Sequence, residues 1–168
     1  PVIVRPALWP YGRRDPTLAR IARALRRGMF PLLDGGRAHL QTVDVQFLAT
    51  VLVTACHHPR AAGQAYLVAD EGAPTWRDVM TQIADILGAQ APRLALPSLP
   101  LRAAAPLVER VWQALPGSWE PPLTRYRAKL MLRDVVFLAD AVERELGVTP
   151  TCSRARALRR ALDVEVAA

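Results

Sequence analysis

A chain of 168 residues is long enough for one folded domain with a hydrophobic core. Its apolar fraction of 51% excludes an intrinsically disordered chain. The formal charge is +7, but the arginines that carry it are scattered along several predicted helices with acidic residues nearby, so nucleic acid is not the expected partner.

Cysteine usage and hydropathy indicate the compartment. Cys56 and Cys152 lie far apart without a second pair, which is typical of reduced thiols. No run is long and apolar enough to span a bilayer, and no segment has the layout of a signal peptide. We therefore expect a cytoplasmic protein without a membrane partner.

The chain opens with an apolar strand. Val2-Ile3-Val4 does not alternate with polar residues, which predicts a strand buried on both faces, and Arg5-Pro6 ends it. This abrupt apolar start, without a methionine, indicates the middle of a longer protein. Asp15-Pro16 then predicts a helix cap and first turn, followed by apolar residues at helical spacing as far as Leu25 and by Gly28 beyond the last turn.

The central part of the chain combines strands with one helix. Asp34-Gly35-Gly36 predicts a turn, and Leu40–Val43 predicts a short strand. Val45–Ala55 predicts an apolar helix that stops before a proline. Ala65–Ala69 is a second continuous apolar run, which predicts another strand buried on both faces.

The remaining part is predicted to be mainly helical. Thr75 and Asp78 have the spacing of a capping box, and so do Asp140 and Glu143. Further helices are predicted over 101–115, which has one strongly apolar face, from Thr124 to Leu130, and after Ser153.

The two apolar strands need neighbours that the sequence does not provide. A strand buried on both faces lies inside a sheet, and an isolated strand is unstable. The chain contains too few predicted strands to surround both runs. We therefore expect the rest of the sheet to lie upstream of residue 1.

Motifs that would make a self-contained active site are missing from the 168 residues. Gly35-Gly36 is not a glycine-rich phosphate loop. No tyrosine has a lysine four residues later, since Tyr126 and Lys129 are spaced by three. His57-His58 lacks the further ligands of a metal site and predicts an exposed helix end. We assign no catalytic or metal-binding residue, and we expect the chain to be inactive alone.

Several stretches, in this order, resemble the extended short-chain dehydrogenases/reductases, the superfamily of NAD-dependent epimerases and dehydratases. The resemblance rests on Val2-Ile3-Val4-Arg5-Pro6 through Tyr11-Gly12, Gly35-Gly36 with Leu40 to Val45, Gly63 to Asp70, and Glu145-Leu146-Gly147-Val148-Thr149-Pro150. Pro121-Pro122-Leu123-Thr124-Arg125 resembles the 3β-hydroxysteroid dehydrogenase-like branch in particular.

The resemblance implies a helix-rich α/β fold, namely the C-terminal part of a Rossmann-type fold with its last parallel strands, plus the small substrate-binding domain. Residues 1–14 would be the end of the Rossmann-type sheet and an active-site loop, and 15–44 a substrate-domain segment. Residues 45–74 would be a helix and strand returning to the sheet, and 75–168 the substrate-binding domain.

The resemblance also implies that the loop after the first strand lies near nicotinamide and substrate. Cofactor-binding residues would be Pro6, Ala7, Leu8 and Tyr11. Substrate-binding residues would be Tyr11, Arg13, Arg37 and Trp112. NAD or NADP is implied for the intact protein only, which would need the missing N-terminal Rossmann half as a partner and could form a homodimer.

The leading hypothesis is the substrate-binding segment of an NAD(P)-dependent oxidoreductase resembling 3β-hydroxysteroid dehydrogenases. Its small-molecule substrate would be an apolar alcohol or ketone, because the segment after Gly88 is rich in Leu, Val and Trp. Arg13 and Arg37 motivate a second hypothesis, a segment of a nucleotide-sugar epimerase or dehydratase. A third is a non-catalytic arginine-rich module that binds nucleic acid or an acidic partner.

Overall fold

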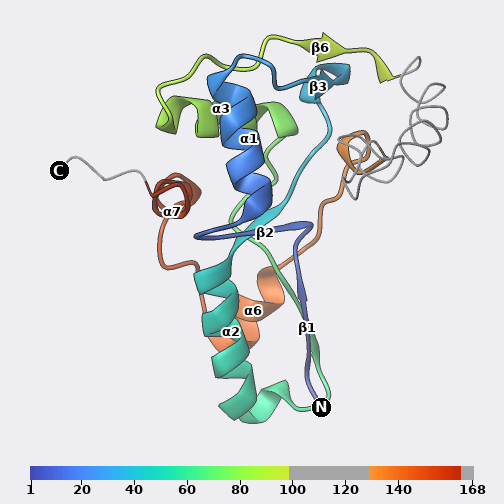
Figure 1. Ribbon diagram of the computed structural model, residues 1–168. Coiled ribbons are helices and arrows are strands. Elements are labelled where there is room, and N and C mark those ends of the chain that lie inside the picture. The colour runs from blue at the N-terminus through green and yellow to red at the C-terminus, as the bar shows by residue number, and fades with distance from the viewer. Residues whose placement is uncertain (99–128, 164–168) are drawn as a thin grey trace, which may run out of the picture.

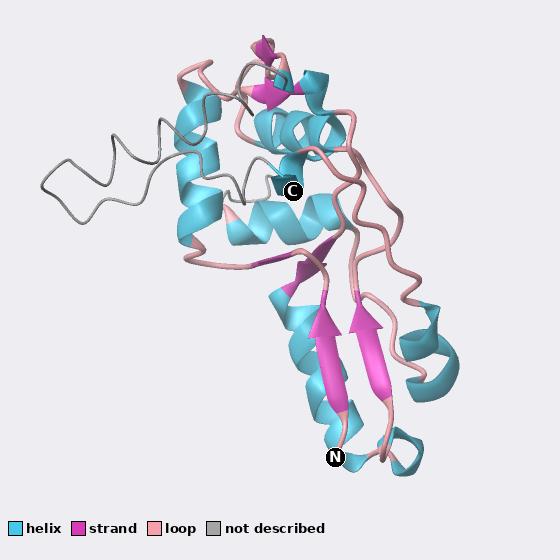
Figure 2. Ribbon diagram, turned by 90° about the vertical axis from the view of Figure 1, so that its right-hand side faces the viewer, coloured by secondary structure: helices cyan, strands magenta, loops and turns pink. Residues whose placement is uncertain are grey.

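The computed structural model describes residues 1–98 and 129–163 as a mixed α/β chain with three two-stranded parallel sheets (Figure 1). One pair of strands lies side by side near the N-terminus, and most of the helices gather at the other end of the molecule (Figure 2). Among the described helices, none has the length and apolar character needed to cross a membrane.

The first sheet joins β1 (Ile3–Pro6) to β5 (Ala65–Val68) in parallel. Both predicted strands are therefore present and adjacent. Tyr66 and Val68 are each 1% exposed, whereas Ile3 is 50% exposed. Burial of both faces was expected only within a larger sheet that includes strands outside this sequence, so it stays a prediction. The side chains of Tyr66 and Val68 pack against helices in the same core as Val51 and Val142.

The other two sheets are short. β2 (Trp9–Tyr11) pairs with β4 (Thr42–Asp44), and β3 (Leu32–Leu33) pairs with β6 (Ala95–Leu96). The strand predicted over 40–43 is thus displaced toward Asp44. Leu40 instead makes an isolated parallel bridge with Val135, a partner that local sequence patterns cannot reveal.

Two of the first three helices begin at the predicted caps, and the third begins at the predicted residue, Val45. The side chain of Asp15 accepts a hydrogen bond from the backbone of Thr17 at the start of α1 (Pro16–Arg26). α3 (Trp76–Ile86) has the predicted capping box, in which both the Thr75 and the Asp78 bonds are formed. α2 (Val45–His57) is capped by Asp44.

The second predicted capping box is wrong. Asp140 is the first residue of α6 (Asp140–Leu146), and Ala139 stands at the cap without a side-chain bond. The Asp140 carboxylate pairs instead with Arg144 one turn later, at 2.7 Å. α7 (Arg154–Ala161) follows Ser153 as predicted. The helix predicted over 101–115 and most of the one predicted from Thr124 lie outside the described residues.

The described side chains form two hydrophobic cores. The helix core joins α1, α3 and α7 to β2 and β3 around Leu18, Leu32, Ile83 and Leu158. The strand core joins β5, α2 and α6 around Tyr66, Val68, Phe47, Val51 and Val142. The short 3-10 turns η1 (Asp34–Gly36) and η2 (Pro59–Ala61) lie at the edges of these cores.

Truncating a side chain of the helix core is expected to destabilise the chain. Leu158 has no exposed surface, so Leu158→Ala should lower the free energy of unfolding by about 2–5 kcal/mol. Leu138 is 86% exposed, so the matched change Leu138→Ala should shift it by no more than about 0.5 kcal/mol. Chemical denaturation checks both values, and equal effects would contradict this account of the core.

Candidate functional site

Buried polar residues gather where β4 and β5 end. Asp70 follows β5 and is 8% exposed. Its carboxylate accepts hydrogen bonds from the Thr42 hydroxyl at 2.8 Å and from the Asp44 backbone at 2.9 Å. Arg160 of α7 donates to the Asp44 carboxylate at 2.5 Å. Two buried carboxylates are thus satisfied at the carboxyl ends of parallel strands, where ligands of open α/β sheets usually bind.

Tyr11, predicted to contact cofactor and substrate, lies beside this cluster and is 1% exposed. Its hydroxyl is buried and makes no hydrogen bond of normal geometry with a described residue. Burial raises the pKa of Tyr11 well above its ordinary value, and the negative charges of Asp70 and Asp44 raise it further. The structure therefore places Tyr11 in the core of the described chain, with its hydroxyl near two carboxylates.

The other predicted cofactor residues form the turn that leaves β1. Pro6 is exposed at the strand end, whereas Ala7 is 4% exposed and its backbone N–H donates to the Val68 carbonyl at 2.7 Å. Leu8 is half-buried against the helix core. Of these three residues, Pro6 is the most accessible to a ligand.

The structure does not bring the predicted substrate residues together. Arg13 forms an ion pair with Asp163 just after α7, at 2.9 Å, and both side chains are more than half exposed. Arg37 lies in a separate cavity. Trp112 lies outside the described residues.

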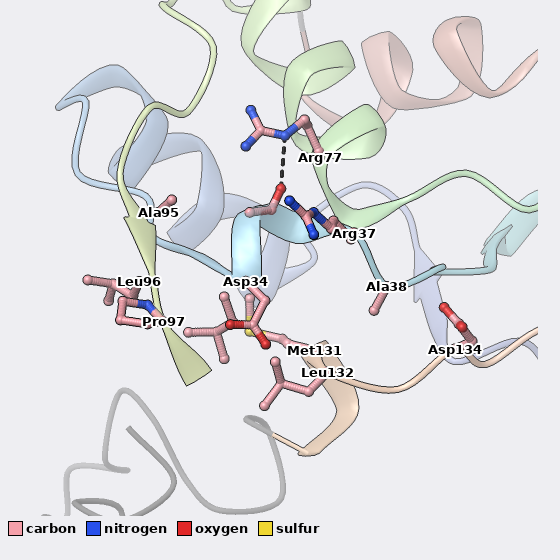
Figure 3. A pocket seen from close by; sticks show the side chains of 12 residues that line it. Asp34, Arg37, Ala38, Arg77, Ala95, Leu96, Pro97, Met131, Leu132 and Asp134 are labelled. Atoms are coloured by element: carbon pink, nitrogen blue, oxygen red, sulfur yellow. Dashed lines mark hydrogen bonds between the residues drawn. The ribbon is translucent and has the colours of Figure 1, made fainter. Parts of the chain in front are cut away.

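The cavity that contains Arg37 lies between η1, β6 and residues 131–134 and has a volume of about 960 Å³ (Figure 3). Apolar side chains supply much of its wall, namely Leu33, Ala38, Ala95, Leu96, Pro97, Met131 and Leu132. Four charged side chains complete it: Asp34, Arg37, Arg77 and Asp134. A second cavity of about 950 Å³ lies between α6, α7 and the segment after β5.

Most of the charged groups in the first cavity are held in place. Arg77 donates from Nε to the Gly35 carbonyl at 2.8 Å, as the dashed line in Figure 3 shows. Asp34 accepts from the Ser98 backbone at 2.8 Å. Asp134 bonds the backbone and the ring Nδ1 of His39, each at 2.9 Å, and these bonds hold the pKa of Asp134 below its ordinary value.

A glycine is required beneath this cavity. Gly36 has a φ of +70°, and a Cβ there would lie 2.9 Å from Leu32 Cδ2 and 3.0 Å from the backbone nitrogen of Arg77. η1 can therefore pack directly on the first turn of α3. That packing places Arg37, which follows η1, on the same rim as Arg77.

The sequence patterns missed Arg77, Asp70 and Arg160. Asp70 had a usable signal, since it directly follows a predicted parallel strand, the position where functional side chains gather. Arg77 and Arg160 had no such signal in the sequence, because arginines on exposed helix faces are common and do not by themselves indicate a site. Among residues 1–98 and 129–163, no three His, Cys, Asp or Glu side chains are grouped so that they could hold a metal ion.

Curated proteins that resemble the chain are reductases and a dehydrogenase. It is 30% identical over 147 residues to a 4-hydroxy-2-methyl-3-oxo-4-farnesyl-3,4-dihydroquinoline-1-oxide ketoreductase of Stigmatella aurantiaca, covering 87% of this chain and 43% of that protein. It is 28% identical over 164 residues to a 2-alkyl-3-oxoalkanoate reductase of Stenotrophomonas maltophilia, covering 95% of this chain and 49% of that reductase. An Arabidopsis thaliana 3beta-hydroxysteroid-dehydrogenase/decarboxylase is 29% identical over 106 residues, which cover 62% of this chain and 19% of that protein.

Solved structures show the same fold. A nucleoside-diphosphate-sugar epimerase from Pseudomonas aeruginosa matches with a TM-score of 0.70 and 23% identity, over 96% of this chain and 46% of that one. A human epimerase family protein with NADPH matches with a TM-score of 0.71 and 18% identity, over 98% of this chain and 48% of that one. No protein-family model matches. The chain spans about half the length of these structures and half or less of the curated relatives, and the predicted fold class is confirmed.

The ion pair between Arg160 and Asp44 is expected to stabilise the chain. Arg160→Met leaves a carboxylate that is 7% exposed without its charged donor, so the free energy of unfolding should fall by about 1–3 kcal/mol. Arg144→Met is the control, because Arg144 pairs with Asp140 in solvent and should contribute under about 1 kcal/mol. Denaturant titration measures both, and equal losses would refute a special role for the buried pair.

Tyr11 is expected to make stability depend on alkaline pH. The unfolded phenol ionises near pH 10.0, whereas the buried one resists ionisation, so the contribution of Tyr11 is complete below that pH and declines above it. The free energy of unfolding should therefore fall faster above about pH 10 in the wild type than in Tyr11→Phe. Parallel pH profiles of the two proteins would show that the hydroxyl is not held neutral.

Proposed function

Because the chain belongs to the extended short-chain dehydrogenase/reductase superfamily, we propose that it forms the substrate-binding part of an NAD(P)-dependent oxidoreductase. The observation that carries the proposal is its likeness, over most of its length, to a ketoreductase and an oxoalkanoate reductase. The free cysteines, exposed Cys56 and half-buried Cys152, are consistent with a cytoplasmic location.

A nicotinamide cofactor would be held mainly by residues outside this sequence. The 168 residues contain no glycine-rich loop to cradle a pyrophosphate. The turn after β1 offers Pro6 as exposed surface at a strand end, which suits one flank of a nicotinamide ring. When bound, the cofactor supplies or accepts the hydride. In this proposal a Rossmann-type segment, on the same or another chain, completes the site.

The residues of this chain would bind and orient the substrate. The cavity beside Arg37 has a mixed wall, in which Leu33, Leu96 and Met131 could meet the hydrocarbon part of an apolar alcohol or ketone. The ketoreductase and the oxoalkanoate reductase described above are named for farnesyl- and alkyl-bearing compounds. In the domain division we propose, residues 1–14 and 45–74 face the cofactor, whereas residues 15–44 and 75–168 face the substrate. Within the substrate-facing part, α6 packs in the strand core.

A cofactor assay tests this function. The protein translated from the whole reading frame that contains this sequence should oxidise NADH or NADPH when given a long-chain methyl ketone, measured as loss of nicotinamide absorbance. The 168-residue chain alone is the matched control and should give no turnover, since it lacks a phosphate loop and a Tyr-x-x-x-Lys pair. Turnover by the chain alone, or none by the longer protein, would overturn the proposal.

A nucleotide-sugar substrate remains the second candidate. Arg37 favours it, because its guanidinium has no partner among the described residues and could meet a phosphate. Epimerisation of a uridine-diphosphate sugar by the longer protein, without ketone reduction, would establish this alternative in place of the first.

A further inference from the structure

One short segment, residues 131–139, forms part of the wall of both cavities, and we call it the strap. Its first half lines the cavity of Figure 3 through Met131, Leu132 and Asp134. Its second half lines the cavity between α6, α7 and the segment after β5 through Phe137, Leu138 and Ala139. Because a single segment supplies both walls, a change in its position alters both cavities at once.

The strap is held by hydrogen bonds rather than by burial. None of its residues is buried, and Leu138 is 86% exposed. Within the described part of the chain, residues 133–138 form hydrogen bonds to other segments only through His39 and Gln41. In Figure 1 the strap runs beside the segment that leads to α2. A segment with so few buried apolar contacts opens at a much lower cost in free energy than the cores do.

Gln41 is the main fastening of the strap. Its side chain is 5% exposed, and its amide donates to the Phe137 carbonyl at 3.0 Å and accepts from the Phe137 backbone N–H at 2.5 Å. His39 adds a second fastening, since its carbonyl accepts from the Val135 N–H at 3.4 Å and both its backbone N–H and its ring bond the Asp134 carboxylate. A buried amide without partners is costly, so Gln41 favours the closed strap.

We propose that the strap opens and closes as a unit and controls access to both cavities, with Gln41 as its latch. The fastenings follow one another along two short backbone segments, with His39 bonded to 134–135 and Gln41 to 137, so the loss of one weakens the others. Gln41 is therefore a positioning residue that does no chemistry. The inference concerns access and holds for any substrate class, so it does not depend on the proposed function.

Backbone hydrogen exchange tests whether the strap opens as a unit. In the protein translated from the whole reading frame, Gln41→Met removes both amide bonds and nearly keeps the side-chain volume. The Val135 N–H should then exchange about tenfold faster, although its own partner, the His39 carbonyl, is unchanged. Conversely, Asp134→Ala should speed exchange of the Phe137 N–H, whose partner Gln41 is unchanged. NMR spectroscopy measures the exchange rate of each amide.

Thiol labelling tests access to the second cavity. Cys152 is half-buried and lines that cavity opposite the strap residues, so N-ethylmaleimide should label it about tenfold faster in Gln41→Met than in the wild type. Cys56 is exposed and should label at an unchanged rate, which makes it the internal control. Gln82→Met is the matched control variant, because Gln82 lines the same cavity but makes no hydrogen bond with the described strap. It should leave the exchange of Val135 and the labelling of Cys152 unchanged. Mass spectrometry of the two cysteine-containing peptides measures both labelling rates.

Three outcomes would overturn the inference: faster exchange in Gln41→Met at Phe137 alone, unchanged labelling of Cys152 in that variant, or equal effects of Gln41→Met and Gln82→Met. Circular dichroism and the exchange of the α3 amides check that each variant is folded. Should Gln41→Met fail this check, Asp134→Ala decides the matter, because it changes an exposed side chain. Unchanged exchange at Phe137 and unchanged labelling of Cys152 in Asp134→Ala would then refute opening as a unit.

Discussion

The buried carboxylate of Asp70 is the constraint on which the described structure depends. The carboxylate accepts hydrogen bonds from the Thr42 hydroxyl and the Asp44 backbone. The backbone N–H of Asp70 donates to the Thr42 carbonyl at 2.7 Å. A buried carboxylate is costly unless such bonds satisfy it, so the end of β5 and the end of β4 must stay next to each other. Arg160 adds α7 to this junction, and the strand core and helix core are thereby held together.

The same junction positions the surfaces that carry the proposed function. Ala7 is bonded to the end of β5, so the turn that leaves β1 is fixed relative to Asp70. The exposed side chain of Ile3 marks the less covered face of the β1–β5 pair, which helices would cover in a larger parallel sheet, whereas further strands would add at the hydrogen-bonding edges of the pair. The Arg37 cavity depends on a different contact, the packing of Gly36 on α3.

Prediction from sequence succeeded where a signal spans a few residues. The cap at Asp15 and the capping box of Thr75 and Asp78 were correct, because each depends on bonds within one helical turn. The same spacing misled at Asp140, where an arginine one turn later competes for the carboxylate. The predicted site residues Arg13 and Arg37 proved to lie apart, since the spacing of residues along the chain does not determine which surface they share.

The sequence by itself therefore determined the helices over the described residues, the two apolar strands and the resemblance to extended short-chain dehydrogenases/reductases. Only the tertiary structure decided that Arg160 meets Asp44, 116 residues away, and that Arg77 shares a cavity with Arg37. The physical reason is range: caps and turns are decided by backbone groups a few bonds away, whereas contacts between distant side chains form only after the packing of both cores has determined the path of the chain.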